Sequence, residues 1–105
     1  MSSQVTRIVA ERNLICIKAD GTRLPVTLRI GMPYPDGESW ACPVALEGVE
    51  RKLPDIHGTD SFQALMLAQR LLLQLMTYVI EDGGHFQTVE EGLPVDIKEL
   101  FVAGI

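Results

Sequence analysis

The two cysteines, Cys16 and Cys42, are the strongest candidates for nucleophilic or redox chemistry. A reactive thiol needs a lowered pKa, which a cation, a histidine or a helix N-terminus supplies. Cys42 alternates with Trp40 and Val44 in a strand-like segment, and isoleucines flank Cys16 on both sides. Both positions are typical of small buried hydrophobic side chains. We therefore expect two free, unreactive thiols on strands that are not neighbours.

The two histidines, His57 and His85, are the next candidates, as metal ligands or proton carriers. A predicted helix of about twenty residues lies between them, and at 1.5 Å per residue it separates them by roughly 30 Å. Neither CxxC nor HxxxH spacing occurs, so no metal site is predicted. We expect no cofactor.

Carboxylates and glycine-rich turns give no catalytic pattern. Asp20 and Asp36 each precede a glycine, and turn formation explains both. The helix start at Gly58–Ser61 offers free N–H groups to an anion, but the carboxylate of Asp60 should occupy them. No phosphate-binding loop and no nucleophile elbow is present. We predict no catalytic residue and no enzymatic activity.

Composition predicts one globular domain over residues 1–105. The net charge is −5, and the nine basic residues are scattered, which argues against a nucleic-acid partner. The first residues, Met1–Gln4, show neither a charged nor an apolar signal region, and two cysteines suit a reducing compartment, so a cytoplasmic protein is expected. Gln69, Arg70 and Gln74 interrupt the long helix, so we expect no membrane span.

That helix, predicted over Ser61–Asp82, is the dominant element. Asp60 and Gln63 form a capping-box pattern, and Gly83 follows as a stop signal. Its apolar residues cover far more than the arc of about 100° that a sheet requires. The stripe expected to face the core is Phe62, Leu65, Ala68, Leu72, Leu75 or Met76, and Val79. The flanking stripes are Met66, Leu73 and Ile80 on one side, and Leu67, Leu71 and Tyr78 on the other.

Four strands are predicted before this helix. They cover Val5–Ala19, Arg23–Ile30, Ser39–Glu47 and Arg51–His57. Asp20-Gly21 supplies the turn of a hairpin between the first two. Pro43 lies inside the third strand and predicts either a bulge or a sheet edge there.

After the helix the pattern is weaker. Phe86–Val89 is consistent with a short strand, and Leu93-Pro94 opens a short helix with Ile97, Leu100 and Phe101 on one side. The predicted fold is therefore α+β: an antiparallel four-stranded meander, then one long helix packed on one face, then a short C-terminal segment. That segment is expected to cover part of the helix, although an interface role stays open.

Two motifs carry a resemblance to a known family. The run Gly58–Ala68, of the form GxDSxQALxLA, resembles the signature of a small bacterial family of uncharacterised single-domain proteins. The step Arg29–Pro33 before Trp40–Pro43 is similar as well, so that the resemblance covers about Val9–Ile80. It implies an antiparallel sheet followed by a helix, and no functional residue.

Surplus apolar surface on the helix favours a non-catalytic interaction module that self-associates, with a dimer as the expected state. The expected interaction surface is Met66, Leu67, Leu71, Leu73, Tyr78, Ile80 and Phe101. One alternative is a small acidic protein that neutralises a protein partner, as immunity proteins, antitoxins and secretion chaperones do. Another is a pocket for a small apolar ligand between sheet and helix, near Trp40, Met66 and Tyr78.

Overall fold

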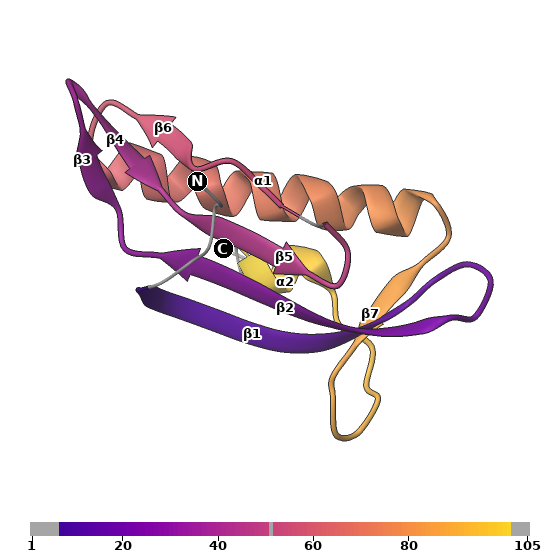
Figure 1. The fold of residues 1–105 in the computed structure, drawn as a ribbon. Helices are drawn as coiled ribbons and strands as arrows, with labels where there is room; N and C mark the ends of the chain where they lie inside the picture. The colour runs from indigo at the N-terminus through magenta and orange to yellow at the C-terminus, as the bar shows by residue number, and fades with distance from the viewer. Residues whose placement is uncertain (1–6, 51, 102–105) are drawn as a thin grey trace.

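The computed structural model describes residues 7–50 and 52–101, and it contains two antiparallel sheets and one long helix (Figure 1). The predicted α+β class is confirmed. The predictions that fall on Val5, Arg51 and the tail from Val102 to Ile105 lie outside the described residues. Helix α1 runs along one side of the strands, and the short helix α2 lies next to it (Figure 1).

The larger sheet has four strands in the order β5-β2-β1-β7. They are β1 (Ile8–Ile17), β2 (Arg23–Gly31), β5 (Val44–Glu47) and β7 (His85–Gln87). The smaller sheet has three strands in the order β3-β4-β6. They are β3 (Tyr34–Asp36), β4 (Ser39–Cys42) and β6 (Ile56–Gly58). The strands therefore form two sheets rather than the single meander that the sequence pattern predicts.

The β1–β2 hairpin closes at the predicted Asp20-Gly21 turn. The N–H of Thr22 donates to the Asp20 carboxylate at 2.9 Å, and Gly21 takes a φ of 89°. These two features give a tight turn with the positive φ that glycine tolerates. On the face towards the helices, the buried side chains are Leu14, Cys16, Val26, Leu28 and Ile30.

Pro43 divides the predicted third strand between the two sheets. Because proline has no N–H, it cannot continue the ladder of a paired strand. Its carbonyl still accepts from the N–H of Gly31 at 2.8 Å, which keeps the chain beside β2. Cys42 and Val44, on either side of the proline, are completely buried. Pro43 is thus the joint at which the chain leaves β4 and enters β5.

The smaller sheet differs most from the sequence prediction. The predicted strand Arg51–His57 shortens to β6, after Pro54, and pairs with β4. The predicted loop Gly31–Glu38 contains the short strand β3, which turns into β4 at Gly37, where φ is 66°. A three-residue strand has too few side chains to show alternation, so β3 could not be recognised from its pattern.

Helix α1 (Ser61–Glu81) begins and ends where the capping signals predict. The Asp60 carboxylate accepts from the N–H of Gln63 at 2.8 Å, and the Gln63 side chain accepts from the N–H of Thr59 at 2.7 Å. At the other end Gly83 has a φ of 97°. The helix therefore has a closed N-terminal capping box and a glycine stop.

The core stripe of α1 is narrower than predicted. Its buried side chains recur at every fourth position: Ala64, Ala68, Leu72 and Met76. Phe62, predicted to face the core, is instead 70% exposed. Positions three apart are rotated by about 300°, so the step from Phe62 to Leu65 to Ala68 drifts about 120° around the helix. The predicted stripe was therefore wrong at its first member.

Two small residues bring α1 close to β6. A Cβ atom added at Gly58 would lie 2.5 Å from the backbone nitrogen of Ala64. Ala64 itself is completely buried. Only glycine permits this separation between strand and helix backbones, because a 2.5 Å contact lies far inside the van der Waals limit. By length and composition α1 is also apolar enough to cross a membrane, a test that the core helix of a soluble protein passes as well.

The C-terminal segment covers part of the helix, as predicted. β7 pairs with the end of β1, and the chain then reaches α2 (Ile97–Phe101). Ile97 is buried, and Leu100 and Phe101 pack against the core from the side of α1. This cover makes Phe101 a packing residue as well as a member of the predicted interaction surface.

The capping box generates a stability prediction. Replacing Asp60 with alanine removes the side chain that accepts from Gln63 and should lower the free energy of unfolding by about 1 kcal/mol. Thermal melts monitored by circular dichroism measure the loss. Asp60→Asn keeps an acceptor at the same place and serves as the matched control. An Asp60→Ala melt equal to wild type would show that this cap contributes nothing.

Candidate functional site

Both cysteines are buried and free, as expected. Burial, and secondly the charge of Asp55, raises the pKa of Cys42 to about 11. Burial raises the pKa of Cys16 too, against the opposing effect of Lys18. The Cys42 thiol points to the carbonyl of Gly31 at 3.4 Å. Raised pKa values disfavour the thiolate, so neither side chain has the environment of a nucleophile.

His57 belongs to a polar cluster on the solvent face of the smaller sheet. Its Nε2 lies 2.9 Å from a carboxylate oxygen of Asp36, and the hydroxyl of Tyr34 donates to Asp55 at 2.5 Å. In the strand register Tyr34 and His57 flank Ala41, which is completely buried. Both hydrogen-bonded pairs, Tyr34 with Asp55 and His57 with Asp36, therefore connect the β3 side of this sheet to the β6 side, across β4.

This cluster is better suited to joining strands than to catalysis. The hydrogen bond to Asp55, followed by burial, raises the pKa of Tyr34 to about 12, which makes its phenolate still less accessible near neutral pH than that of an ordinary tyrosine. His57 and Asp36 are both about half exposed, with 52% and 54% of their side chains accessible. Among residues 7–50 and 52–101, no group of three or more His, Cys, Asp or Glu side chains is arranged to hold a metal ion.

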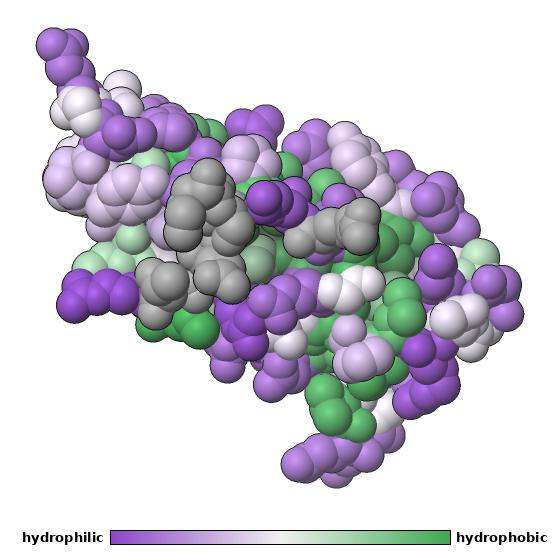
Figure 2. Space-filling view, in the orientation of Figure 1, coloured by the Kyte–Doolittle hydropathy of each residue, from purple (hydrophilic) through white to green (hydrophobic). Residues whose placement is uncertain are grey.

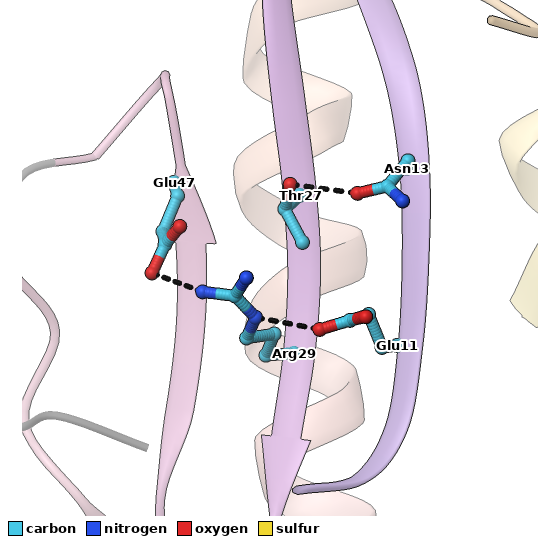
Figure 3. A network of polar contacts seen from close by, with 5 residues as sticks. All are labelled: Glu11, Asn13, Thr27, Arg29 and Glu47. Atoms are coloured by element: carbon cyan, nitrogen blue, oxygen red, sulfur yellow. Dashed lines mark hydrogen bonds and ion pairs between the residues drawn. The ribbon is translucent and has the colours of Figure 1, made fainter. Parts of the chain in front are cut away.

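A second polar network lies on the open face of the larger sheet (Figure 3). Arg29 on β2 lies between Glu11 of β1, at 2.7 Å, and Glu47 of β5. The hydrogen bond that Arg29 donates to Glu11, and the charge of Glu47, raise the pKa of the Arg29 guanidinium. At the next cross-strand pair on this face, the Thr27 hydroxyl donates a hydrogen bond of 2.8 Å to the side-chain oxygen of Asn13. These contacts hold three strands in register, and exposed ion pairs of this kind contribute little stability.

One cavity of about 320 Å³ opens between the larger sheet and the C-terminal end of α1. Its wall is apolar, with Cys16, Leu24, Val49 and Val79, and its rim carries three charged side chains: Lys18, Asp20 and Asp82. The apolar pocket expected from the sequence lies elsewhere, near Trp40, Met66 and Tyr78. None of those three lines this cavity, and Met66 and Tyr78 are 40% and 51% exposed.

The predicted interaction surface, which comprises residues of α1 and Phe101 of α2, divides into exposed and partly buried residues. Met66, Tyr78 and Ile80 are exposed. Four others are partly buried: Leu67, Leu71, Leu73 and Phe101. Phe62, which the sequence analysis assigned to the core, is more exposed than any of these. A helical projection centred on Ala64 and Ala68 would have placed Phe62 beside Met66, because those two positions are one turn apart.

Further hydrophobic side chains are exposed on the sheet side of the molecule. Figure 2 shows hydrophobic surface near the start of β1 and on the loop after β7, with hydrophilic side chains between them. The exposed residues at these places are Ile8 and Val9, and Val89 and Leu93. They form separate spots rather than one continuous patch.

A protein-family model matches most of this chain. The model is described as domain of unknown function DUF6968, and it covers residues 10–94. The chain belongs to that family. No curated protein and no solved structure matches it.

The thiol environments generate a chemical prediction. At pH 8, a pKa of about 11 rather than 9.0 leaves about 100-fold less thiolate on Cys42. Titration with a thiol reagent should therefore show two slow groups in the native protein and two fast groups after denaturation. Cys42→Ala should remove one slow group and leave Cys16 unchanged. Rapid labelling of Cys42 in the native protein would contradict this prediction and would indicate a reactive cysteine.

Proposed function

We propose that this protein is a non-catalytic interaction module that forms a homodimer through one flank of α1. The α1 flank consists of Phe62, Met66, Leu73 and Ile80. At 100° per residue these four positions fall within about 40° of one another around the helix. The observation that carries the proposal is Phe62, a large aromatic side chain with 70% exposure at one end of this flank.

The cover supplied by α2 leaves both ends of the α1 flank accessible. Leu73, in the middle, packs against the core and is partly buried. Phe62 and Met66 near the first turn, and Ile80 near the last, remain exposed. A two-fold axis near the middle of α1 would set Phe62 of one copy against Ile80 of the other. The flank is thus complementary to itself, which is what a two-fold interface requires.

A non-catalytic role is supported by the state of the polar side chains. The thiols are buried with raised pKa values, and Tyr34 and His57 are each held by a carboxylate. We infer a cytoplasmic protein from the two free cysteines, since thiols persist in reducing compartments. We also infer a core helix rather than a membrane span, because α1 buries a continuous stripe and carries Arg70 at its centre.

The dimer is tested by the mass in solution. Light scattering at tens of micromolar should give twice the chain mass of 11.6 kDa. Phe62→Glu and Met66→Glu should each reduce the mass to that of one chain and leave the circular dichroism spectrum unchanged. An acidic residue at position 62 suits the first turn of a helix, so unfolding is not expected.

A matched control separates the interface from a general charge effect. Gln74 is exposed on the same helix, outside the α1 flank, so Gln74→Glu should keep the dimer. A wild-type mass of 11.6 kDa would contradict the proposal. A variant that unfolds would place the substituted residue in the core of the single chain.

A second candidate function is binding of a small, largely apolar ligand. The supporting observation is the cavity of about 320 Å³ beside Cys16, which is within the size range of small-molecule sites. A ligand in that cavity would slow the labelling of Cys16 further and leave Cys42 unchanged. Leu24→Trp, which fills the cavity, should remove this protection; protection that survives the substitution would exclude the cavity as the site.

A further inference from the structure

In the part of the chain that the structure describes, the outer edge of β1 is unpaired along most of the strand. β1 pairs with β2 from Ile8 to Ile17, whereas β7 pairs only with Ile15–Ile17. Within residues 7–50 and 52–101, no strand pairs with this edge between Ile8 and Leu14 (Figure 1). Backbone N–H and C=O groups along such an edge can pair with an added strand.

Few of the usual protective features occur on this edge. Edge strands are commonly protected by proline, lysine, a bulge or an inward-pointing charge. Ile8–Leu14 contains no proline or lysine, and its bulge is confined to the step from Ile8 to Ala10. Arg12, on the same face as Leu14, is the one inward charge. The stretch Ala10–Leu14 therefore has regular strand geometry, and Arg12 limits pairing with an indiscriminate apolar strand.

Two grooves adjoin the open edge, one beside the loop after β7 and one beside the helices, and Glu11 and Arg12 line both. A groove of about 470 Å³ separates Glu11–Asn13 from the loop Thr88–Glu91. Two hydrogen bonds between Thr88 and Leu93, at 2.8 and 2.9 Å, close that loop and fix this wall. On the helix side a groove of about 160 Å³ is lined mainly by apolar side chains, together with Gln69; the apolar ones include Leu28, Ile30, Leu72, Leu100 and Phe101.

The two grooves differ in charge. The loop-side groove is lined by the guanidinium of Arg12 and by three carboxylates: Glu90, Glu91 and Glu11, of which Glu11 is paired with Arg29. Side chains of an added strand alternate between the two faces. Those facing the loop would meet negative charge, and those facing the helices would meet apolar surface.

Charge also decides against a second copy of β1 as the occupant. Faces are preserved when two sheets join edge to edge, so a second β1 would bring its own Glu11 into the acidic groove. Like charges directly opposite each other destabilise a strand pair.

We propose that the open edge of β1 binds an extended segment of another protein in which basic and apolar residues alternate. The backbone of that segment extends the sheet, its basic side chains face Glu90 and Glu91, and its apolar side chains face Leu100 and Phe101. This surface uses residues distinct from the α1 flank, so it does not depend on the homodimer. The proposed partner segment is thus basic, which complements the net charge of −5 of this protein.

The test uses synthetic peptides of about seven residues with blocked ends, matched to the length of the open edge. A Lys-Val alternating peptide should bind at least about tenfold more tightly than a Glu-Val peptide of the same pattern, by titration calorimetry. Replacing the central valine with proline should abolish binding, because the ladder is interrupted. Amides of Ile8–Leu14 should gain protection from hydrogen exchange in the complex.

The variants separate this proposal from attraction by net charge. The double variant Glu90→Lys and Glu91→Lys should weaken Lys-Val binding at least about tenfold. Glu38 and Glu81 are exposed elsewhere, so their double lysine replacement is the matched control and should bind as wild type. The Met66→Glu variant should bind the peptide normally even where it fails to dimerise. Equal binding of the proline peptide, equal loss in the control variant, or no binding at millimolar peptide would overturn the proposal.

Discussion

The close contact between β6 and the first turns of α1 is the constraint on which the rest of the fold depends. Gly58 leaves no room for a side chain against Ala64, and Ala64 and Ala68 are completely buried. Small residues therefore let the helix backbone approach the strands directly. This orientation turns Phe62 and Met66 away from the core, because they lie on a neighbouring stripe of the same turns. The surface that we propose for self-association is thus a consequence of how the helix is seated.

The division of the strands into two sheets has a related consequence at β1. Pro43 ends pairing in the smaller sheet and passes the chain to β5, which completes the larger sheet beside β2. Among the described residues, the other side of that sheet is completed only by the three residues of β7. A long strand with a short neighbour leaves an open edge, and the loop after β7 supplies acidic side chains beside it. Each proposed surface therefore lies on a long element, α1 or β1, that its neighbouring elements cover only in part.

Local signals made some elements predictable from the sequence, and long-range pairing made others unpredictable. The Asp60 cap, the Asp20-Gly21 turn and the stop at Gly83 each depend on nearby residues, and all three occur as predicted. The buried cysteines followed from strand alternation. The strand order could not be predicted in this way, because nothing local to His85–Gln87 indicates that this strand pairs with β1. On α1, helical spacing predicted that Met66 and Ile80 lie outside the core stripe, and both are exposed. Phe62 was assigned to the core, because its burial depends on which stripe meets the small residues of the strands.

The free energy of unfolding of Gly58→Ala, measured by urea denaturation, tests this account most directly. The added methyl group would lie 2.5 Å from the Ala64 nitrogen, so helix and strand must separate. Overpacking of this kind should lower the unfolding free energy by roughly 1–3 kcal/mol. Thr59→Ala, one exposed residue further along, should remain within about 0.5 kcal/mol of wild type. A Gly58→Ala variant as stable as wild type would contradict the claim that the close approach of α1 to β6 organises the fold.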